Sequence, residues 1–204
     1  MAIDHLVYGA PSLATAVDVL EARFGVRAQV GGKHLGLGTH NALLALGRRT
    51  YLEVIAPDPE QPSPSNPRPF GLDELTSARL VGWAIGCDDI DVAVSRARNA
   101  GYDPGDAIDM ARTTPTGAML RWRLTLNALA GGPVPFLIAW GDTEHPATAS
   151  PHGLILETFE IEHPEPESLA AILRALGADV GVKPADFPAL VAHIRGRDGT
   201  RELR

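Results

Sequence analysis

Hydrophobic and polar residues alternate in short blocks along this chain, and three longer stretches replace the alternation with helical spacing. The first block, 3–9, is rich in β-branched and apolar residues and predicts a strand that ends at Gly9. After Ser12, a good helix N-cap, apolar residues recur at helical spacing until Gly25 ends the pattern. Further strands are predicted over 27–31, 41–46 and 50–56. Together these elements predict a βαβββ unit.

The same succession returns about 80 residues later as a repeat of pattern rather than of sequence. A strand over 80–86 precedes a helix that Asp88 and Asp89 cap and Gly101 ends. One face of that helix carries Ile90, Ala93, Val94 and Ala97, and the strands that follow are predicted near 106–112, 118–126 and 134–140. The predicted fold class is therefore α+β with tandem βαβββ units.

The C-terminal part predicts a third, abbreviated β-α-β-β unit. A strand over 154–162 is followed by an amphipathic helix over 165–177 and by strands over 189–195 and 200–203. Five prolines between Asp58 and Pro69 indicate a connector between the first two units. The predicted division is a first unit at 1–57, a Pro-rich connector at 58–79, a second unit at 80–145 and a partial third unit at 146–204 that packs on the others.

Composition narrows the classes of function. The chain has 204 residues, a net charge of −7 and 45% hydrophobic residues, which is typical of a globular protein. The acidic balance argues against nucleic acid and anionic membrane surfaces as partners. Cys87 is the single cysteine, so neither an intrachain disulfide nor a cysteine-based zinc cluster is expected. No apolar run or leader pattern indicates a membrane span or a signal peptide, and we expect a cytoplasmic protein.

Strand alternation places several charged residues on a common face. On 50–56 the wholly apolar set must face the helices, because burying Glu53 there without a partner would cost several kcal/mol. The same argument on strands 3–9 and 118–126 predicts that His5, Arg121 and Arg123 share the face of Glu53. That face is either a solvated surface or the wall of a cavity, and alternation does not choose between them.

Four stretches carry a resemblance to a known family. They are the Ile-Asp-His-Leu-Val opening, the Tyr-Leu-Glu-Val-Ile strand, the glycine-rich stretch 31–43 and Phe-Gly-Leu at 70–72. With the tandem βαβββ pattern, they resemble the vicinal oxygen chelate superfamily and, more narrowly, its glyoxalase-like members. The resemblance covers residues 1–145 well. It implies a sheet that curls into a half-barrel per unit and forms a cleft. It also implies a divalent metal held by four ligands, one from the first and last strand of each unit.

Only half of that ligand set is present. The resemblance assigns the first-unit ligands to His5 and Glu53, but the second-unit positions fall on Gly82 and Ile138 or their neighbours, which are not ligands. The missing ligands could come from a partner chain or from other side chains of this chain, namely His34, His40, Asp142 and Glu144. The metal would be zinc, nickel, manganese or iron, and a site without metal is equally compatible with the sequence.

The same residues allow other chemistry. His5 and Glu53 could act as an acid–base pair, because a carboxylate orients a histidine and raises its basicity. Arg121 and Arg123 form either a fork for a carboxylate or phosphate, or part of a solvated strand face.

The glycine-rich stretch offers a further candidate. His34, His40 and Asn41 belong either to a loop that folds over the cleft and contacts the ligand or to a hairpin turn. Gly82 and Ala84 would leave room for a ligand or allow close sheet packing.

Other chemistry-bearing residues are expected to play no part. The histidines near prolines in the C-terminal loops are expected at the surface; they are His145, His152 and His163. The thiol of Cys87 is expected to stay protonated beside Asp88 and Asp89.

The leading functional hypothesis is a glyoxalase-like small-molecule enzyme of the lyase, isomerase or oxygenase type. It would act on an anionic, oxygen-bearing substrate in the cleft. The alternative is a metal-free protein of the same fold that binds or sequesters a small molecule. A weaker alternative is a partner-binding scaffold built on the C-terminal unit. The resemblance also permits a homodimer. The sequence does not specify the substrate or the reaction.

Overall fold

The computed structural model describes residues 2–114, 117, 119–125 and 131–204. The first unit contains β1 (Ile3–Gly9), α1 (Leu13–Phe24), β2 (Gln29–His34), β3 (Thr39–Ala45) and β4 (Tyr51–Pro57). The second contains β5 (Arg79–Gly86), α2 (Ile90–Asn99), β6 (Ala107–Thr113), β7 (Met119–Thr125) and β8 (Phe136–Ala139). The C-terminal part contains β9 (Ile155–His163), α3 (Pro166–Leu176), β10 (Gly181–Pro184), β11 (Ala189–Gly196) and β12 (Gly199–Leu203).

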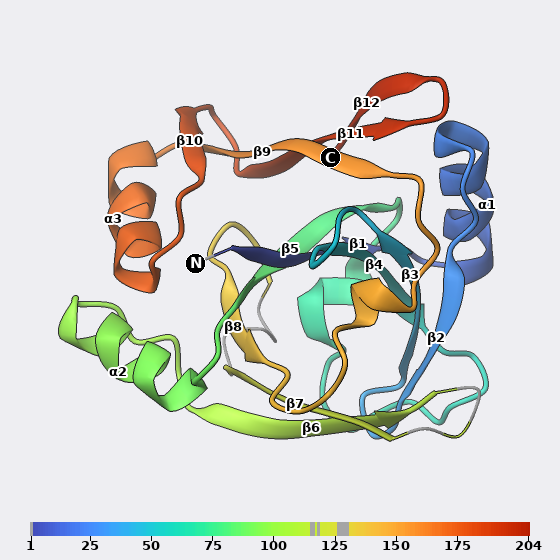
Figure 1. Ribbon diagram of the computed structural model, residues 1–204, viewed down its shortest axis with the longest axis horizontal. Helices are drawn as coiled ribbons and strands as arrows, with labels where there is room; N and C mark the ends of the chain where they lie inside the picture. Colours follow the sequence, from blue (N-terminus) through green and yellow to red (C-terminus); the bar gives the residue numbers. More distant parts are fainter. Residues whose placement is uncertain (1, 115–116, 118, 126–130) are drawn as a thin grey trace.

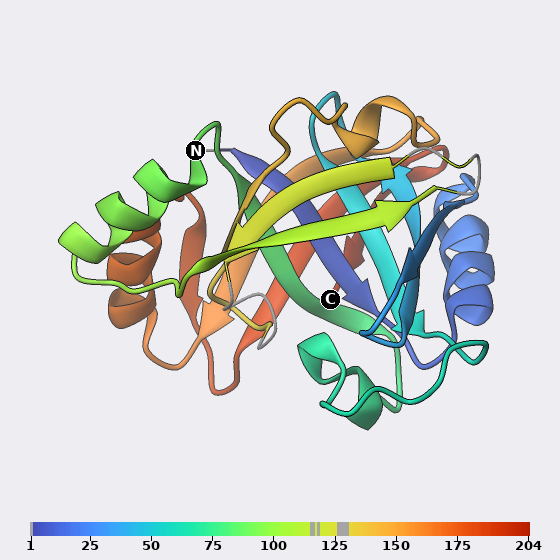
Figure 2. The same ribbon diagram turned by 90° about the horizontal axis from the view of Figure 1, so that it is seen from below.

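The first two units share one eight-stranded sheet in the order β2-β3-β4-β1-β5-β8-β7-β6. β1 and β5 pair antiparallel at its centre, and each pairs in parallel with the last strand of its own unit. The sheet curls until its two edge strands approach each other, as Figures 1 and 2 show. A hydrogen bond from the guanidinium of Arg112 on β6 to the carbonyl of Gly31 on β2 joins these edges. The result is a nearly closed barrel.

The helices begin and end where the sequence signals predict. The hydroxyl of Ser12 accepts a hydrogen bond from the Thr15 amide at the start of α1, and Gly25 ends that helix in the left-handed conformation. The carboxylate of Asp89 accepts hydrogen bonds from two amides in the first turn of α2. Each cap satisfies amides that a helix cannot satisfy internally, so short helices of 12 and 10 residues are stable at these positions.

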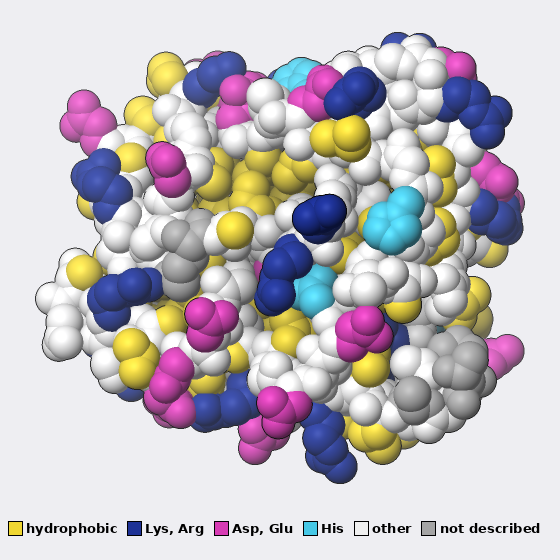
Figure 3. Space-filling view, viewed as in Figure 1, with side chains coloured by type: hydrophobic (Ala, Val, Ile, Leu, Met, Phe, Trp, Pro, Cys, Tyr) yellow, Lys and Arg dark blue, Asp and Glu magenta, His cyan; other side chains and the backbone are white. Residues whose placement is uncertain are grey.

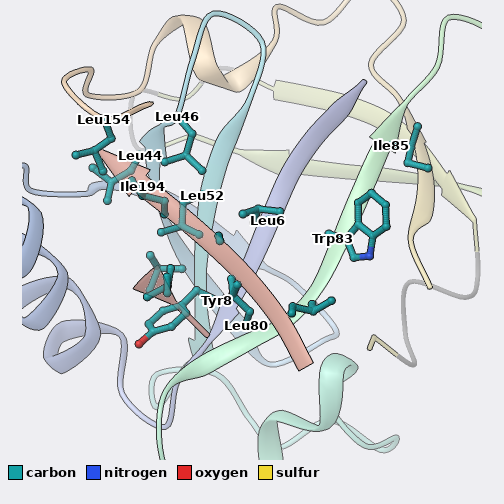
Figure 4. Packing of buried hydrophobic residues seen from close by; sticks show 14 of the residues in the cluster. Leu6, Tyr8, Leu44, Leu46, Leu52, Leu80, Trp83, Ile85, Leu154 and Ile194 are labelled. Carbon is teal, nitrogen blue, oxygen red and sulfur yellow. The ribbon is translucent and has the colours of Figure 1, made fainter. Parts of the chain in front are cut away.

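The main core lies on the outer face of the barrel, between the eight-stranded sheet, the helices and a second, four-stranded sheet. Figure 4 shows Leu6 and Leu52 of the larger sheet packed beside Ile194 of β11. Trp83 is fully buried there, contacts Phe159 edge-on at 5.1 Å between ring centroids, and donates its indole hydrogen bond to a backbone carbonyl. This packing fixes β1 and β5, the two central strands of the eight-stranded sheet.

Several sequence expectations need correction in the structure. The C-terminal part contains one strand more than predicted, β10. It therefore repeats the succession βαβββ, but with a different strand order, β10-β9-β11-β12. The glycine-rich stretch is largely strand, because β2 runs to His34 and β3 starts at Thr39. The Pro-rich connector includes a short 3-10 segment at Pro69–Glu74. Residues 118 and 126, the ends of one predicted strand, lie outside the described residues.

Basic and acidic side chains are interspersed over the face seen in Figure 3. Within the described ranges, no helix is long and apolar enough to cross a membrane.

Candidate functional site

The interior of the barrel contains a cavity of about 160 Å³. Its walls come from both halves of the sheet, and apolar and aromatic side chains predominate among them. A few polar groups lie on the first-unit wall and on β6. The lining residues are His5, His34, Leu37, Asn41, Leu43, Tyr51, Glu53, Ile55, Pro69, Phe70, Ile108, Met110, Arg112, Trp122, Leu124, Phe136, Ile138 and Trp140. An apolar cavity with a few convergent polar groups is the usual form of a small-molecule site.

His5 points into this cavity from β1, and Asp4 lies behind it. The Nδ1 atom of His5 lies 2.7 Å from Asp4 Oδ1, while Asp4 Oδ2 accepts hydrogen bonds of 3.1 Å from Trp140 Nε1 and from His145 Nε2. Burial by itself would raise the pKa of Asp4. The hydrogen bonds from His145 and His5, with the attraction of those rings when protonated, outweigh burial and lower the pKa to about 2. Asp4 is therefore a carboxylate at neutral pH and can only accept hydrogen bonds.

This network fixes the tautomers of both histidines. Because Asp4 only accepts, the hydrogen of neutral His5 lies on Nδ1, and the lone pair of Nε2 faces the cavity. His145 donates from Nε2 to Asp4 and accepts a 3.2 Å hydrogen bond from the Ala147 amide at Nδ1. When His5 is neutral, this network thus turns its unprotonated Nε2 atom toward the cavity, with the ring held by a buried carboxylate.

Glu53 lies beside His5 on the neighbouring strand. Its Oε2 atom is 3.8 Å from His5 Nε2, and its Oε1 atom accepts a 2.6 Å hydrogen bond from the amide of Asn41. The other amide atom, Asn41 Oδ1, is the one buried side-chain nitrogen or oxygen of the described residues that has no hydrogen-bond partner. It lies against Gly31, where a Cβ atom would come within 2.2 Å of it. Gly31 therefore makes room for the amide that orients Glu53.

His34 extends the polar wall beyond Glu53. Its Nε2 atom is 3.9 Å from Glu53 Oε1, and its Nδ1 atom forms a 3.0 Å hydrogen bond with the hydroxyl of Thr39. Burial lowers the pKa of His34, so this ring is neutral at neutral pH.

Arg112 supplies the positive charge of the cavity from β6. Its side chain is 7% exposed, and burial lowers its pKa from the ordinary value, although a guanidinium stays protonated. Nearby, burial raises the pKa of Tyr51 well above its ordinary value, so this phenol is neutral. The Tyr51 ring stacks on the imidazole of His5 with 4.6 Å between centroids and fixes the plane of that ring.

Aromatic side chains complete the walls. Trp122 and Trp140 lie 5.5 Å apart between ring centroids, and Phe136 contacts His5 edge-on at 5.3 Å. Phe70 enters from the connector with φ of 61°, the only positive φ of a non-glycine residue among those described. A Cβ atom at Gly82 would lie 3.1 Å from the Phe70 ring. Of the two alternatives for Gly82, room for a ligand or close packing, the structure shows close packing, here against the ring of Phe70.

The structure does not bring Arg121 and Arg123 to the cavity. Arg121 is exposed, and Arg123 forms an ion pair with Asp91 at 2.6 Å on the outer side of the sheet. The predicted faces of this strand are therefore exchanged, since Trp122 and Leu124 line the cavity. The expectation failed because α2 presents a carboxylate to this strand, which lets a charged side chain face the helix.

The remaining predicted residues divide between the cavity and the surface. His34 and Asn41 line the cavity as strand residues rather than as a covering loop, whereas His40 is half-buried with Nδ1 3.9 Å from Asp58. Asp142 and Glu144 are exposed and do not line the cavity.

His145 corrects another expectation. It was expected at the surface with His152 and His163, but it is buried against Asp4, while His152 is exposed and His163 half-buried. Burial raises the pKa of the Cys87 thiol to about 11, so this thiol is protonated at neutral pH.

The donor set does not fit the four-ligand metal centre that the resemblance implies. β1 ends at Gly9 and β5 ends at Gly86, so the residues two places earlier, Val7 and Ala84, occupy equivalent positions in the two units. Val7 pairs with Glu53 on β4, and Ala84 pairs with Phe136 on β8. The register thus assigns the second-unit counterpart of Glu53 to Phe136 rather than Ile138. Within the described part of the chain, no group of three or more histidine, cysteine or acidic residues is arranged to hold a metal ion.

Two functional groups were missed from the sequence. Arg112 continues the alternation of Ile108 and Met110 on the cavity face of β6, and a charged residue on an otherwise apolar face was the available signal. Asp4 gave no such signal, because its partners Trp140 and His145 are distant in sequence.

Comparisons with known proteins agree with this architecture. A family model described as a glyoxalase-like domain matches residues 3–177, and no curated protein matches the chain in sequence. A solved structure of a hypothetical protein from Staphylococcus aureus is similar with a TM-score of 0.62 at 14% identity, covering 98% of this chain and 83% of that chain. That likeness shows the fold alone.

Weaker similarity connects the chain to two methylmalonyl-CoA epimerases. The Streptomyces coelicolor epimerase gives a TM-score of 0.45 at 18% identity, covering 72% of this chain and 99% of that chain. The Mycobacterium tuberculosis epimerase gives 0.44 at 18% identity, covering 67% and 86%.

Proposed function

Because this chain belongs to the glyoxalase-like domain family of the vicinal oxygen chelate superfamily, we propose that its cavity is the active site of a small-molecule enzyme. The proposed reaction is a proton transfer at a carbon next to a carbonyl, as in an isomerase or lyase. One observation carries the proposal. The hydrogen bond between His5 Nδ1 and Asp4 leaves the lone pair of His5 Nε2 available, and Nε2 faces the cavity 3.8 Å from Glu53 Oε2.

The proton transfer begins at His5. The substrate C–H bond breaks and its proton passes to His5 Nε2. The electron pair of that bond forms a C=C bond, and the π electron pair of the carbonyl moves to its oxygen, which gives an enolate. Return of the proton to a different carbon or to the other face completes an isomerisation, and loss of a leaving group completes an elimination. Asp4 keeps its hydrogen bond to Nδ1 and stabilises the imidazolium that forms.

Glu53 and Arg112 would act on the charges that develop. The Glu53 carboxylate, oriented by Asn41, lies close enough to stabilise protonated His5. Arg112 offers a buried positive charge to the anionic oxygen of the substrate or enolate. Since the donor set does not fit the implied metal centre, no step is assigned to a metal.

A second candidate is a protein that binds a small molecule without transforming it. The largely apolar lining of the cavity favours this candidate, because apolar walls bind a ligand by burying its surface and take no part in a reaction.

Solvent exchange tests the proposal directly. The protein is incubated in D₂O with pyruvate, phenylpyruvate and acetophenone, and deuterium uptake next to the carbonyl is followed by proton NMR. We expect exchange above the buffer rate for at least one probe. We also expect it to fall about 10²- to 10⁴-fold in His5→Ala, the usual contribution of a general base. Glu53→Gln should lower the rate less, because it removes a supporting charge.

The matched control is Arg123→Gln, since Arg123 pairs with Asp91 outside the cavity. It should leave the exchange rate unchanged. Equal exchange rates in the wild-type protein and in His5→Ala for every probe would reject proton transfer. Binding of a probe without exchange would then favour the second candidate.

A further inference from the structure

The size of the cavity limits its ligand. Cavities of about 150 Å³ lined by apolar side chains accommodate a benzene-sized molecule, and this cavity measures about 160 Å³. Its aromatic walls include the paired indoles of Trp122 and Trp140 and the ring of Phe136. Flat aromatic walls favour a flat ring, because offset or edge-on ring contacts add attraction beyond burial. The apolar part of the cavity therefore fits one ring.

The charge of Arg112 limits the ligand further. The part of the chain that the structure describes offers this buried guanidinium no ion-pair partner, and its hydrogen bond goes to the neutral carbonyl of Gly31. Glu53, which attracts it electrostatically, is held instead by the amide of Asn41. A buried charge without a hydrogen-bonded counter-charge is costly, so an anion on Arg112 would relieve that cost.

The other charges near the cavity favour a single negative charge. The Asp4 carboxylate is already compensated by three N–H donors, and the carboxyl group of Glu53 lies 3.8 Å from His5. A dianionic phosphate would bring more negative charge to a wall that already holds Glu53. A carboxylate carries one charge and matches the paired donors of a guanidinium.

We propose that the cavity binds a carboxylate joined to a single ring, with the ring between the aromatic walls and the carboxylate on Arg112. The proposal rests on the proposed function in that it assigns a substrate class to the same cavity. It leaves the chemical step open, since a binding protein could take the same ligand.

Tryptophan fluorescence gives a binding assay. Of the three tryptophans, Trp122 and Trp140 line the cavity, while Trp83 is fully buried in the outer core and supplies a constant background. The probes are benzoate, benzyl alcohol, acetate and 1-naphthoate. We expect benzoate to bind at least about tenfold more tightly than benzyl alcohol, because a hydrogen bond between two charged groups is stronger than one to a neutral hydroxyl. Acetate, which lacks the ring, and 1-naphthoate, which exceeds the cavity, should bind more weakly than benzoate.

Variants of Arg112 test the role of the charge. Arg112→Gln should abolish the preference for benzoate over benzyl alcohol, and Arg112→Lys should retain part of it. Thermal melts check that both variants fold, because Arg112 also joins two strands through Gly31. Arg123→Gln is the matched control and should keep the full preference, since Arg123 is outside the cavity.

The two proposals fail in different ways. Benzoate has no hydrogen on the carbon next to its carboxylate, so its binding does not depend on proton transfer. Benzoate binding without solvent exchange of any probe would keep the ligand class and reject the enzyme. Exchange of acetophenone with equal affinities for benzoate and benzyl alcohol would keep the enzyme and reject the ligand class. An unchanged preference in a folded Arg112→Gln protein would also overturn the ligand class.

Discussion

The substitution Asp4→Asn should invert the tautomer of His5. The Asp4 carboxylate accepts one hydrogen bond at Oδ1 from His5 and two at Oδ2 from Trp140 and His145. Asparagine has one oxygen and one NH₂ group, so it can satisfy only one side of this network. Keeping the oxygen toward Trp140 and His145 satisfies two donors and turns the NH₂ toward His5. The hydrogen of His5 must then move to Nε2, and the lone pair would leave the cavity.

The magnitude follows from the same contacts. The pKa of Asp4 lies at about 2 against an ordinary value of 3.8, and each unit corresponds to about 1.4 kcal/mol, so ionised Asp4 contributes about 2 kcal/mol to folding. We expect Asp4→Asn to lower the free energy of unfolding by about 2–3 kcal/mol at neutral pH. Solvent exchange should fall by about 10³- to 10⁴-fold, the loss that follows when a catalytic histidine is held in the wrong tautomer.

Two measurements check this prediction. Nitrogen-15 NMR of the imidazole rings reports which nitrogen of His5 carries the hydrogen, and urea unfolding gives the stability. The control Asp91→Asn removes an exposed carboxylate that pairs with Arg123 and should change neither the tautomer nor the exchange rate. A folded Asp4→Asn protein with His5 still protonated at Nδ1, or with undiminished exchange, would refute the assigned role of Asp4.

Three further outcomes are expected. The folded-state pKa of Asp4 lies below its unfolded value, so the contribution of Asp4 to the free energy of unfolding should be present above pH 3.8 and lost as the pH falls through 2. Urea unfolding from pH 5 to 2 should show this loss in the wild-type protein and not in Asp4→Asn. Phe70→Gly should widen the cavity and relieve a positive φ, so the affinity for 1-naphthoate should rise relative to that for benzoate in the fluorescence assay. An unchanged ratio of the two affinities would contradict the assigned position of the Phe70 ring. Gly31→Ala should displace the Asn41 amide and slow solvent exchange about tenfold or more, because the hydrogen bond from Asn41 to Glu53 would be lost. The control Gly181→Ala adds a methyl group in open space and should leave the rate unchanged. Equal rates in the two variants would exclude this role for Gly31.

Local signals in the sequence were sufficient for most of the fold. Strands β1 and β4 and helices α1 and α2 were predicted because alternation, caps and glycine stops depend on neighbours in sequence. The strand β10 was missed because it is short and largely exposed and lacks an alternating apolar face. The hairpin of β2 and β3 was partly assigned to a loop because its glycines serve close packing rather than flexibility, as Gly31 against Asn41 illustrates.

The candidate site was only partly predictable, because local signals do not show which residues distant in sequence meet. His5 and Glu53 follow from alternation on strands covered by apolar packing. The two faces of β7 were assigned the wrong way round, because the position of Asp91 relative to Arg123 depends on how α2 crosses the sheet. His145 was assigned to the surface because only the closed structure brings it against Asp4. Contacts between residues distant in sequence thus decide which polar residues are functional.

The near-closure of the barrel places two unequal halves around one cavity. The first half supplies the titratable groups, including His5, Glu53 and His34, whereas the second supplies Arg112 and most of the aromatic surface. Where internal symmetry would repeat the acidic position, Phe136 stands instead. The two halves therefore share the arrangement of their strands but place different side chains around the cavity. Substitutions in the first half should change reactivity, and those in the second should change which molecules are accepted, so the two properties could be altered independently by engineering or divergence.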